Sequence, residues 1–422
     1  MTKGNCLIAC GGGPTHVINQ SLVAAALEAM KNDNVGDVFA PVHGVDGIVQ
    51  ERFYDLKRED PRNLELVANT PGAAPGSTRT KPSEIMLEQI LEVLKKRDIR
   101  TFLYNGGQDT ALALKKLKDM ARHIGYDEVE VHVPKTIDGD LVVNDHSIGY
   151  PSAARYVAGV FGGLNFDNMS LPGIFVGKIM GRDSGFLPAA SSLGRTSERD
   201  GPHLVYLPER PQTVEQVLKD IGEVYKRLGF CLVAMSEGLR APYENSTIPF
   251  EAALTNYLKE EYGFGIDFGR MSEDVLKKKD SFGHPELSSY PLFELLLQFA
   301  LVAKYQDRVR VQALGYPQRS FLNDVSRIDV EEARLVGRKA VEYALSGKYD
   351  SGSVVLLRAP GNDYSVYTEL RKLEEVAGLT KYLPDEYIGS DGKSIAPAFR
   401  EYGEPLIGKL PETGFLRHEV RY

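Results

Sequence analysis

One short run of charged residues could carry a chemical reaction. Residues 134–141 read PKTIDGDL and follow the apolar segment VEVHVP, which is typical of a buried strand. Lys135 offers a point positive charge that suits a phosphate. Asp138 and Asp140 lie two apart, so in an extended segment they face the same side, where one can act as a base and the other can hold Mg²⁺. Ordinary charges on a solvated turn are the alternative interpretation.

Two glycine-containing segments follow other apolar runs and could bind phosphate. CGGGP contains Gly12 and Gly13 and precedes helical residues, so backbone N–H groups and a helix N-terminus could face an anion. In YNGGQDT, Asp109 opens a helix, where it either caps the helix or contributes to a metal or phosphate site. The sequence lacks the GxGxxG fingerprint of dinucleotide-binding enzymes and the GxxxxGK[ST] motif of P-loop enzymes.

Three further clusters also follow apolar segments. Their candidate residues are Arg182 in GKIMGRDSGF, Glu237 in MSEGL, and Arg310, Tyr316 and Arg319 in RVRVQALGYPQRS. An arginine fork could bind a phosphate or a developing negative charge, and a carboxylate could accept hydrogen bonds from sugar hydroxyls. Each of these residues, considered alone, is more often an ordinary surface residue.

Strands and helices alternate along the chain, and this alternation places the clusters. The predicted strands lie within 6–12, 37–44, 100–107, 129–134, 174–181, 203–209, 231–238, 310–316 and 353–360, and the predicted helices within 19–31, 85–97, 110–124, 213–228 and 329–345. The pattern predicts an α/β fold with mostly parallel sheets covered by helices on both faces. Such sheets bind ligands at the carboxyl ends of their strands, where these clusters fall.

The chain length of 422 residues suits two domains. We predict two doubly wound, Rossmann-like domains, the first formed by residues 1–150 with about 310–345 returning to it, and the second by residues 151–310. Residues 346–422, rich in Gly, Pro and charge, are expected to form a C-terminal appendage.

Composition excludes several classes of protein. Apolar residues make up 42% and charged residues 26%, which is ordinary for a soluble globular protein. The net charge of −8 gives no reason to expect a nucleic acid or an anionic membrane as partner. The chain has 3 cysteines, an odd number without metal-site spacing, which suits a reducing compartment. No apolar run is long enough for a signal peptide or a membrane span, so a cytoplasmic location is expected.

Taken in order, the segments GGGP, GGQDT, PKTIDGDL, MGRDSGF, SEGL and GYPQRS resemble the phosphofructokinase family, from about residue 5 to about residue 330. ATP-using relatives carry a glycine where Lys135 stands and often one where Asp109 stands, so the chain resembles the pyrophosphate-dependent branch. This resemblance implies reversible, Mg²⁺-dependent transfer of a phosphoryl group from pyrophosphate to the 1-hydroxyl of fructose 6-phosphate, giving fructose 1,6-bisphosphate and phosphate.

The resemblance also implies roles for the matching positions. Asp138 would be the general base, and the first domain would hold the phosphoryl donor while the second holds the sugar phosphate. Pyrophosphate would be bound by Lys135, Gly12 and Gly13, and Asp109 would obstruct a nucleotide's α-phosphate. The sugar and the transferred group would be contacted by Thr136, Ile137, Met180, Gly181 and Arg182, with Arg79 nearby, and the sugar hydroxyls would be bound by Glu237. The 6-phosphate would be bound by Arg310, Tyr316 and Arg319, and Mg²⁺ by Asp140 and Gln108.

Three positions depart from the family pattern. Gln108 stands where many relatives have an aspartate that helps place Mg²⁺, Tyr316 replaces a histidine, and Gly173 replaces an arginine that crosses a subunit interface. Subunit-shared sites in the family imply a homodimer or homotetramer. Two other functions stay open, an ATP-dependent 6-phosphofructokinase and a non-catalytic regulatory subunit of the same fold.

Overall fold

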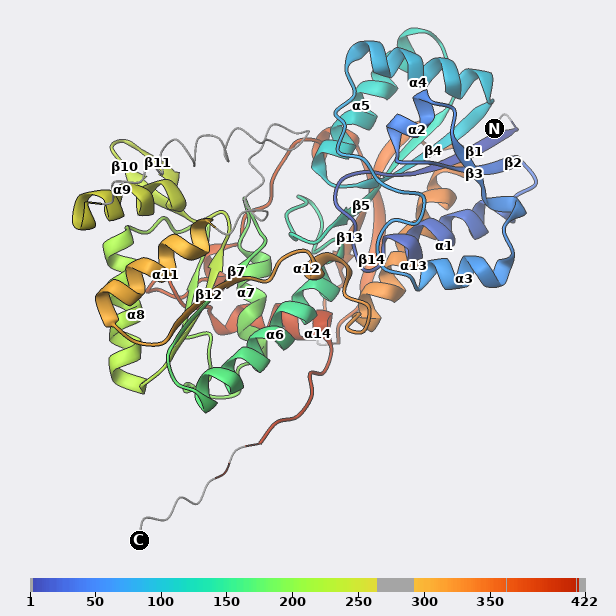
Figure 1. The fold of residues 1–422 in the computed structure, drawn as a ribbon. Coiled ribbons are helices and arrows are strands. Elements are labelled where there is room, and N and C mark those ends of the chain that lie inside the picture. The colour runs from blue at the N-terminus through green and yellow to red at the C-terminus, as the bar shows by residue number, and fades with distance from the viewer. Residues whose placement is uncertain (1–2, 264–291, 362, 415, 417–422) are drawn as a thin grey trace.

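Two β-sheets divide the chain into two lobes (Figure 1). The computed structural model describes residues 3–263, 292–361, 363–414 and 416. Two sheets with helices on both faces are the architecture predicted from the alternating pattern, and the predicted α/β fold class is confirmed.

The larger sheet has the strand order β14-β13-β5-β4-β1-β2-β3, with β6 beside β5. Its central pairs are parallel, and only the pairs β2–β3 and β13–β14 at its two ends are antiparallel. The strands are β1 (Gly4–Cys10), β2 (Val35–Pro41), β3 (Phe53–Asp55), β4 (Ile99–Gly106), β5 (Val129–Thr136), β6 (Ile148–Gly149), β13 (Ser351–Arg358) and β14 (Val366–Arg371).

Helices cover both faces of the larger sheet because its strands are apolar on both faces. In β1, Ile8 packs into a core shared with α1 and α13, whereas Leu7 packs into another core shared with α4 and α5. The helices are α1 (Ile18–Met30), α2 (Val45–Val49), α3 (Pro61–Ala68), α4 (Glu84–Lys96), α5 (Gln108–His123) and α13 (Arg327–Leu345), with a short 3₁₀ turn at Leu56–Arg58. Helix α1 lies against α13 at Gly337, where a Cβ would stand only 2.2 Å from the carbonyl oxygen of Ser21.

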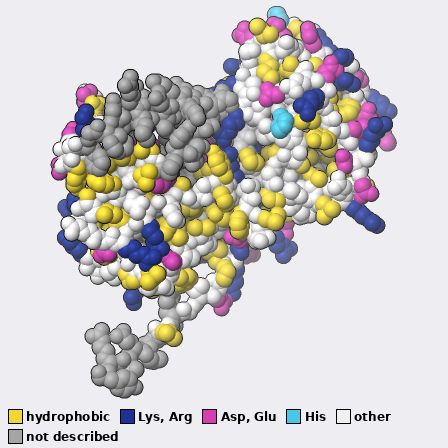
Figure 2. Space-filling model, viewed as in Figure 1, with side chains coloured by type: hydrophobic (Ala, Val, Ile, Leu, Met, Phe, Trp, Pro, Cys, Tyr) yellow, Lys and Arg dark blue, Asp and Glu magenta, His cyan; other side chains and the backbone are white. Residues whose placement is uncertain are grey.

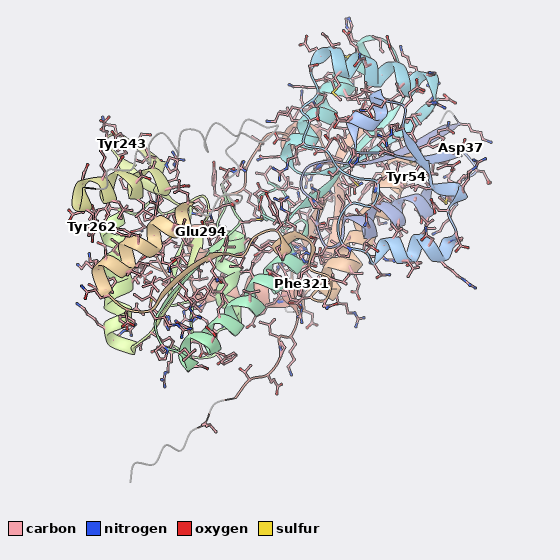
Figure 3. All side chains as sticks on the ribbon, viewed as in Figure 1. Asp37, Tyr54, Tyr243, Tyr262, Glu294 and Phe321 are labelled. Atoms are coloured by element: carbon pink, nitrogen blue, oxygen red, sulfur yellow. The ribbon has the colours of Figure 1, made fainter. Side chains whose placement is uncertain are left out.

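The smaller sheet has the order β12-β7-β9-β8, and all of its strands are parallel. Its strands are β7 (Ile174–Ile179), β8 (Leu204–Tyr206), β9 (Cys231–Ser236) and β12 (Val309–Ala313), and a separate hairpin joins β10 (Arg240–Tyr243) to β11 (Ser246–Pro249). Its lobe contains α6 (Tyr150–Ser170), α7 (Phe186–Ala190), a 3₁₀ turn (Ser191–Gly194), α8 (Val214–Leu228), α9 (Phe250–Tyr262), α11 (Leu292–Tyr305) and α12 (Pro317–Ser320). Figure 3 labels Glu294 on α11 in this lobe, and Asp37 and Tyr54 in the other lobe.

The C-terminal residues differ from the expected appendage. Strand β13 pairs in parallel with β5, with Ser351 opposite Glu130, so the apolar run VVLL extends the larger sheet. After β14 the chain passes through 3₁₀ turns at Leu373–Glu375 and Asp385–Tyr387 to α14 (Pro397–Ile407), which packs on α6. The Gly and Pro content of this region reflects long connections between packed elements.

The surface carries charged side chains of both signs over the larger lobe, with apolar side chains between them (Figure 2). None of the helices within the described ranges combines the length and the apolar character that crossing a bilayer requires.

Candidate active site

The strand ends of both sheets meet at one cleft of about 210 Å³. Its lining residues are Gly12, Gly13, Pro14, Arg79, Gly107, Gln108, Asp109, Thr110, Lys135, Thr136, Ile137, Asp138, Asp140, Met180, Arg182, Asp183, Glu237, Tyr316 and Arg319. All six clusters singled out in the sequence contribute to this list. They converge because parallel strands present their carboxyl ends at the same edge of a sheet.

Lys135, near the end of β5, reaches across to the glycine run after β1. Its ammonium donates to the carbonyl oxygen of Gly13 at 2.6 Å, and its side chain is buried. Burial, followed by repulsion from Arg319, lowers the pKa of Lys135 to about 8. At Gly12, where φ is +75°, a Cβ would lie 3.3 Å from this ammonium, so glycine suits both the turn and the approach of the lysine.

The two aspartates follow Lys135 on the same loop. Burial raises the pKa of Asp138, and the charges of Arg319 and Arg182 oppose this shift. Burial and then the charge of Asp138 raise the pKa of Asp140 to about 7. Gly139 separates them with φ +71°, a conformation that side-chain-bearing residues rarely adopt. The site thus holds two carboxylates close enough to repel each other.

Hydrogen bonds join the three motifs of the smaller lobe. The side-chain oxygen of Gln318 accepts from the backbone N–H of Met180 at 3.1 Å, which ties the GYPQRS segment to MGRDSGF. The hydroxyl of Ser236 donates to the carbonyl oxygen of Gly181 at 2.6 Å, and the N–H of Glu237 donates to Ile179 at 2.8 Å. These bonds hold Arg182 and Glu237 on adjacent strand ends.

Cations gather at the end of the cleft near α12. The guanidinium of Arg319 stacks 4.6 Å from the ring centroid of Tyr316. Burial, followed by repulsion from Arg79, lowers the pKa of Arg319. Gly13 is small enough to leave room for Arg319, since a Cβ there would lie 3.0 Å from its guanidinium. The cleft therefore favours anionic groups, although the chain as a whole is acidic.

Gln108 and Asp109 begin α5 at the wall of the cleft. The side-chain oxygen of Gln108 accepts a hydrogen bond from the hydroxyl of Thr380 at 3.0 Å. Asp109 forms an ion pair with Lys81 at 3.2 Å and makes no side-chain cap for α5. Asp109 lies in the first turn of α5, where a negative charge is favoured, so the choice between a helix-terminus role and a ligand-binding role stays a prediction.

Two predicted site residues do not line this cleft. Gly181 turns the backbone at φ +125° between two residues that line the cleft, Met180 and Arg182. Arg310 is paired with Phe175 near the start of β12, away from the strand ends, and its guanidinium forms an ion pair with Asp167 at 2.6 Å. Its placement does not support contact with a 6-phosphate in this cleft.

Asp183 and Thr380 belong to the site but were not among the predicted site residues. Asp183 lines the cleft and lies inside the MGRDSGF motif, so its position in that motif was an available signal. Thr380 reaches Gln108 from 272 positions later in the chain, and no spacing rule connects the two.

The acidic residues fit a magnesium ion that is shared with a phosphate ligand. In the described ranges, no three His, Cys, Asp or Glu side chains gather closely enough to hold a metal by themselves. Mg²⁺ is commonly held by one or two carboxylates together with substrate phosphates and water. A cation beside Asp138 and Asp140 would relieve the repulsion that raises the pKa of Asp140.

Comparison with known proteins decides the family. The sequence matches the profile of the family described as Phosphofructokinase over residues 5–344. The chain belongs to the phosphofructokinase family. The matched range contains all of the residues that line the cleft of this phosphofructokinase-family chain.

Three relatives illustrate how far the similarity extends. A protein of Rhodospirillum rubrum named pyrophosphate–fructose 6-phosphate 1-phosphotransferase is 44% identical over 99% of this phosphofructokinase-family chain and 98% of its own length. One of the same name from Halomonas elongata is 32% identical over 96% of this chain and 92% of its own. The crystal structure of a pyrophosphate-dependent phosphofructokinase from Marinobacter aquaeolei matches with a TM-score of 0.78 and 30% identity, over 98% of this chain and 93% of that one.

Proposed function

We propose that this chain transfers a phosphoryl group from pyrophosphate to the 1-hydroxyl of fructose 6-phosphate, reversibly, giving fructose 1,6-bisphosphate and phosphate. The observation that carries the proposal is the buried ammonium of Lys135, held 2.6 Å from Gly13 O at a glycine run, three residues before a carboxylate in the same cleft. The names of the relatives from Rhodospirillum rubrum and Halomonas elongata support the same donor and acceptor.

Asp138 is the proposed general base. Phosphoryl transfer needs positioning and charge neutralisation more than covalent help from the protein, together with a group that takes the proton of the attacking hydroxyl. Burial raises the pKa of Asp138, which makes it a better proton acceptor than an exposed aspartate. Arg182 and Arg319, whose charges act on Asp138, would stabilise negative charge on the transferred group.

Pyrophosphate would lie against Lys135 and the backbone of Gly12 and Gly13. A ligand with two or more negative charges would offset the free-energy cost of burying the Lys135 ammonium. The ligand would itself be stabilised by a cation that is already held in place. Asp109 and its partner Lys81 would fill space that the rest of a nucleotide needs, which argues against the ATP-dependent alternative.

Mg²⁺ is the proposed cofactor, held by Asp140 together with the phosphates of the ligand. When bound, it would neutralise charge on the phosphoryl oxygens. The proposed role of Gln108 as a further ligand would require its side-chain oxygen to bind the metal in addition to Thr380. An amide oxygen has two lone pairs and can therefore accept from Thr380 and bind a metal ion at the same time. The role of Gln108 as a metal ligand stays a prediction.

The sugar phosphate would occupy the side of the cleft formed by the smaller lobe, and the donor the side formed by the larger lobe. Glu237 would accept hydrogen bonds from sugar hydroxyls, with Thr136, Ile137 and Met180 alongside the sugar. Tyr316 and Arg319 would bind the 6-phosphate. The predictions of a homodimer or homotetramer and of a cytoplasmic location stay predictions.

Phosphorus NMR tests the proposal directly. Purified protein with Mg²⁺, pyrophosphate and fructose 6-phosphate should convert the pyrophosphate signal into inorganic phosphate and a sugar 1-phosphate signal. Fructose 1,6-bisphosphate with phosphate should regenerate pyrophosphate. If neither direction proceeds, or if pyrophosphate is hydrolysed without a sugar product, the proposed function is wrong.

A further inference from the structure

A short C-terminal segment lies along the back of the loop that carries the two aspartates. We call residues 376–383 the C-terminal strap. Thr380 pairs with Leu141 in an antiparallel bridge, and the strap reaches the smaller lobe where the N–H of Leu383 donates to Glu209 at 2.8 Å. The same oxygen of Glu209 accepts from the N–H of Gly185, directly before α7. The strap therefore contacts elements from both sides of the cleft.

Lys381 is the residue of the strap that holds both ends of the loop from Asp140 to Asp145. Its backbone N–H donates to the carbonyl oxygen of Asp140 at 2.7 Å. Its ammonium donates to the carbonyl oxygens of Asn144 at 2.9 Å and of Asp145 at 2.7 Å. Bonds from an ammonium to carbonyl oxygens are stronger than neutral ones, so this side chain closes the loop with charge-assisted bonds.

The loop contains a backbone conformation that needs such support. Val143 has φ +66°, in the left-handed region that β-branched residues rarely occupy. Strained conformations of this kind persist only where surrounding contacts fix them. Val143 itself is 37% exposed, so its own packing supplies little of that fixing. The bonds of Lys381 bracket it on both sides.

The same ammonium is connected to the two aspartates by packing. It lies 4.9 Å from the ring centroid of Phe186. Phe186 in turn packs under Gly139, where a Cβ would stand 3.1 Å from the Cβ of Phe186. Gly139 is the residue between Asp138 and Asp140, so a change at Lys381 would reach the reacting groups through the loop and through this ring.

We propose that Lys381 is a positioning residue for phosphoryl transfer: it fixes the 140–145 loop and thereby the orientation of the Asp138 carboxylate. This inference rests on the proposed function for its kinetic test. The C-terminal strap would thus support the catalytic loop, a role that no motif in the sequence indicated. Lys381 does not line the cleft, so its effect would fall on the rate and not on ligand affinity.

The test compares Lys381→Met with a matched control, Lys393→Met. Lys393 is also a partly buried lysine of the C-terminal region, but its ammonium pairs with Asp220 on α8, away from the loop. We expect Lys381→Met to lower kcat by about 10- to 100-fold, as small misplacements of reacting groups do, with the KM for both substrates changed less than about 3-fold. Lys393→Met should keep kcat within about 2-fold.

A double-variant cycle separates positioning from general damage. In an Asp138→Asn background there is no base left to position, so Lys381→Met should cause little further loss of rate. An equal loss in both backgrounds, or an equal loss in the two lysine variants, would overturn the proposal.

Hydrogen–deuterium exchange provides a readout that does not depend on activity. Peptides covering 138–147 should exchange faster in Lys381→Met than in wild type and unchanged in Lys393→Met. If the wild type turns over no phosphoryl donor, the proposed function fails while this comparison still decides whether Lys381 fixes the loop. Unchanged exchange in Lys381→Met would contradict the inference whatever the activity.

Discussion

The ammonium of Lys135 lies 2.6 Å from the carbonyl oxygen of Gly13 and so joins the end of β5 to the glycine run that follows β1. This contact places a buried cation where the sequence also places backbone N–H groups, in the wall of the cleft that holds Asp138. It makes Lys135 the residue through which the choice of phosphoryl donor is best tested.

Replacing Lys135 and Asp109 together by glycine should change the donor. Pyrophosphate would lose its buried cation, and removing the Asp109 carboxylate together with its ion pair to Lys81 would open space for a nucleotide at the wall of the cleft. We expect kcat/KM for pyrophosphate to fall by at least about 100-fold and turnover with ATP to become measurable. Loss of pyrophosphate use without any gain of ATP use would show that more than these two side chains select the donor.

Asp138→Asn should remove the base while keeping the shape of the loop. We expect kcat to fall by about 10²- to 10⁴-fold, because general base catalysis contributes a factor of this size. The midpoint of thermal unfolding should stay close to that of the wild type, since the backbone N–H of residue 138 still donates to the Thr136 hydroxyl at 3.1 Å, a bond that does not involve the substituted side chain. An unchanged kcat would move the base to another residue.

Gly139→Ala should damage both the loop and the rate. The left-handed φ of +71° costs about 1–2 kcal/mol for an alanine, and its Cβ would also press on Phe186 at 3.1 Å. Gly125→Ala is the matched control, because Gly125 has φ +65° and no atoms within 4 Å of the added Cβ. Both variants should lose stability in urea unfolding, but only Gly139→Ala should lower kcat. Equal kcat values would mean that the loop tolerates the shift.

A buried histidine makes the stability of the fold depend on pH. His146 donates or accepts hydrogen bonds at both ring nitrogens, 2.9 Å from Asp145 and 2.6 Å from Glu332. Burial opposes its protonation, but the charge of Glu332 and the bonds to both carboxylates outweigh burial and raise its pKa to about 9. Other charged or titratable groups around this pair of carboxylates include Asp329, Arg358, Lys381 and the tyrosines Tyr150, Tyr364, Tyr387 and Tyr402.

The direction of the pH effect follows from this raised pKa. His146 stabilises the fold fully below its ordinary pKa near 6.5, and this stabilisation, about 3 kcal/mol, is lost as the pH rises through about 9. The unfolding free energy of His146→Gln should therefore fall furthest below wild type at pH 6 and approach it at pH 9. His123→Gln, at an exposed position in the last turn of α5, is the matched histidine control. A constant difference between His146→Gln and wild type would mean that folding leaves the pKa of His146 unchanged, which would contradict the raised pKa.

Most of the fold could be predicted from the sequence because its signals are local. The five predicted helices correspond to α1, α4, α5, α8 and α13, since each has an apolar face with helical spacing. Helix α6 gave no such signal: its small residues Gly159, Gly162 and Gly163 interrupt the apolar pattern. Strand β13 was predicted as a strand but not as part of the larger sheet, because the run VVLL does not state which strand it pairs with.

Some residues of the candidate site have a local sequence signal and others have none. Lys135, Asp138 and Arg182 could be predicted because each follows an apolar run at the carboxyl end of a parallel strand. Arg310 was assigned because it lies near a predicted strand end. In the structure it lies near the start of β12, away from the carboxyl ends of the strands, and its guanidinium forms an ion pair with Asp167. Thr380 and Lys381 could not be found, because their partners lie more than 200 positions away along the chain.

A comparison of phosphoryl donors tests the central claim most directly. With saturating fructose 6-phosphate and Mg²⁺, kcat/KM is measured for pyrophosphate and for ATP on the purified wild-type chain. The buried Lys135 beside Gly13, with Asp109 in the wall of the cleft, predicts efficient turnover with pyrophosphate and little or none with ATP. Turnover with ATP and none with pyrophosphate would contradict the account.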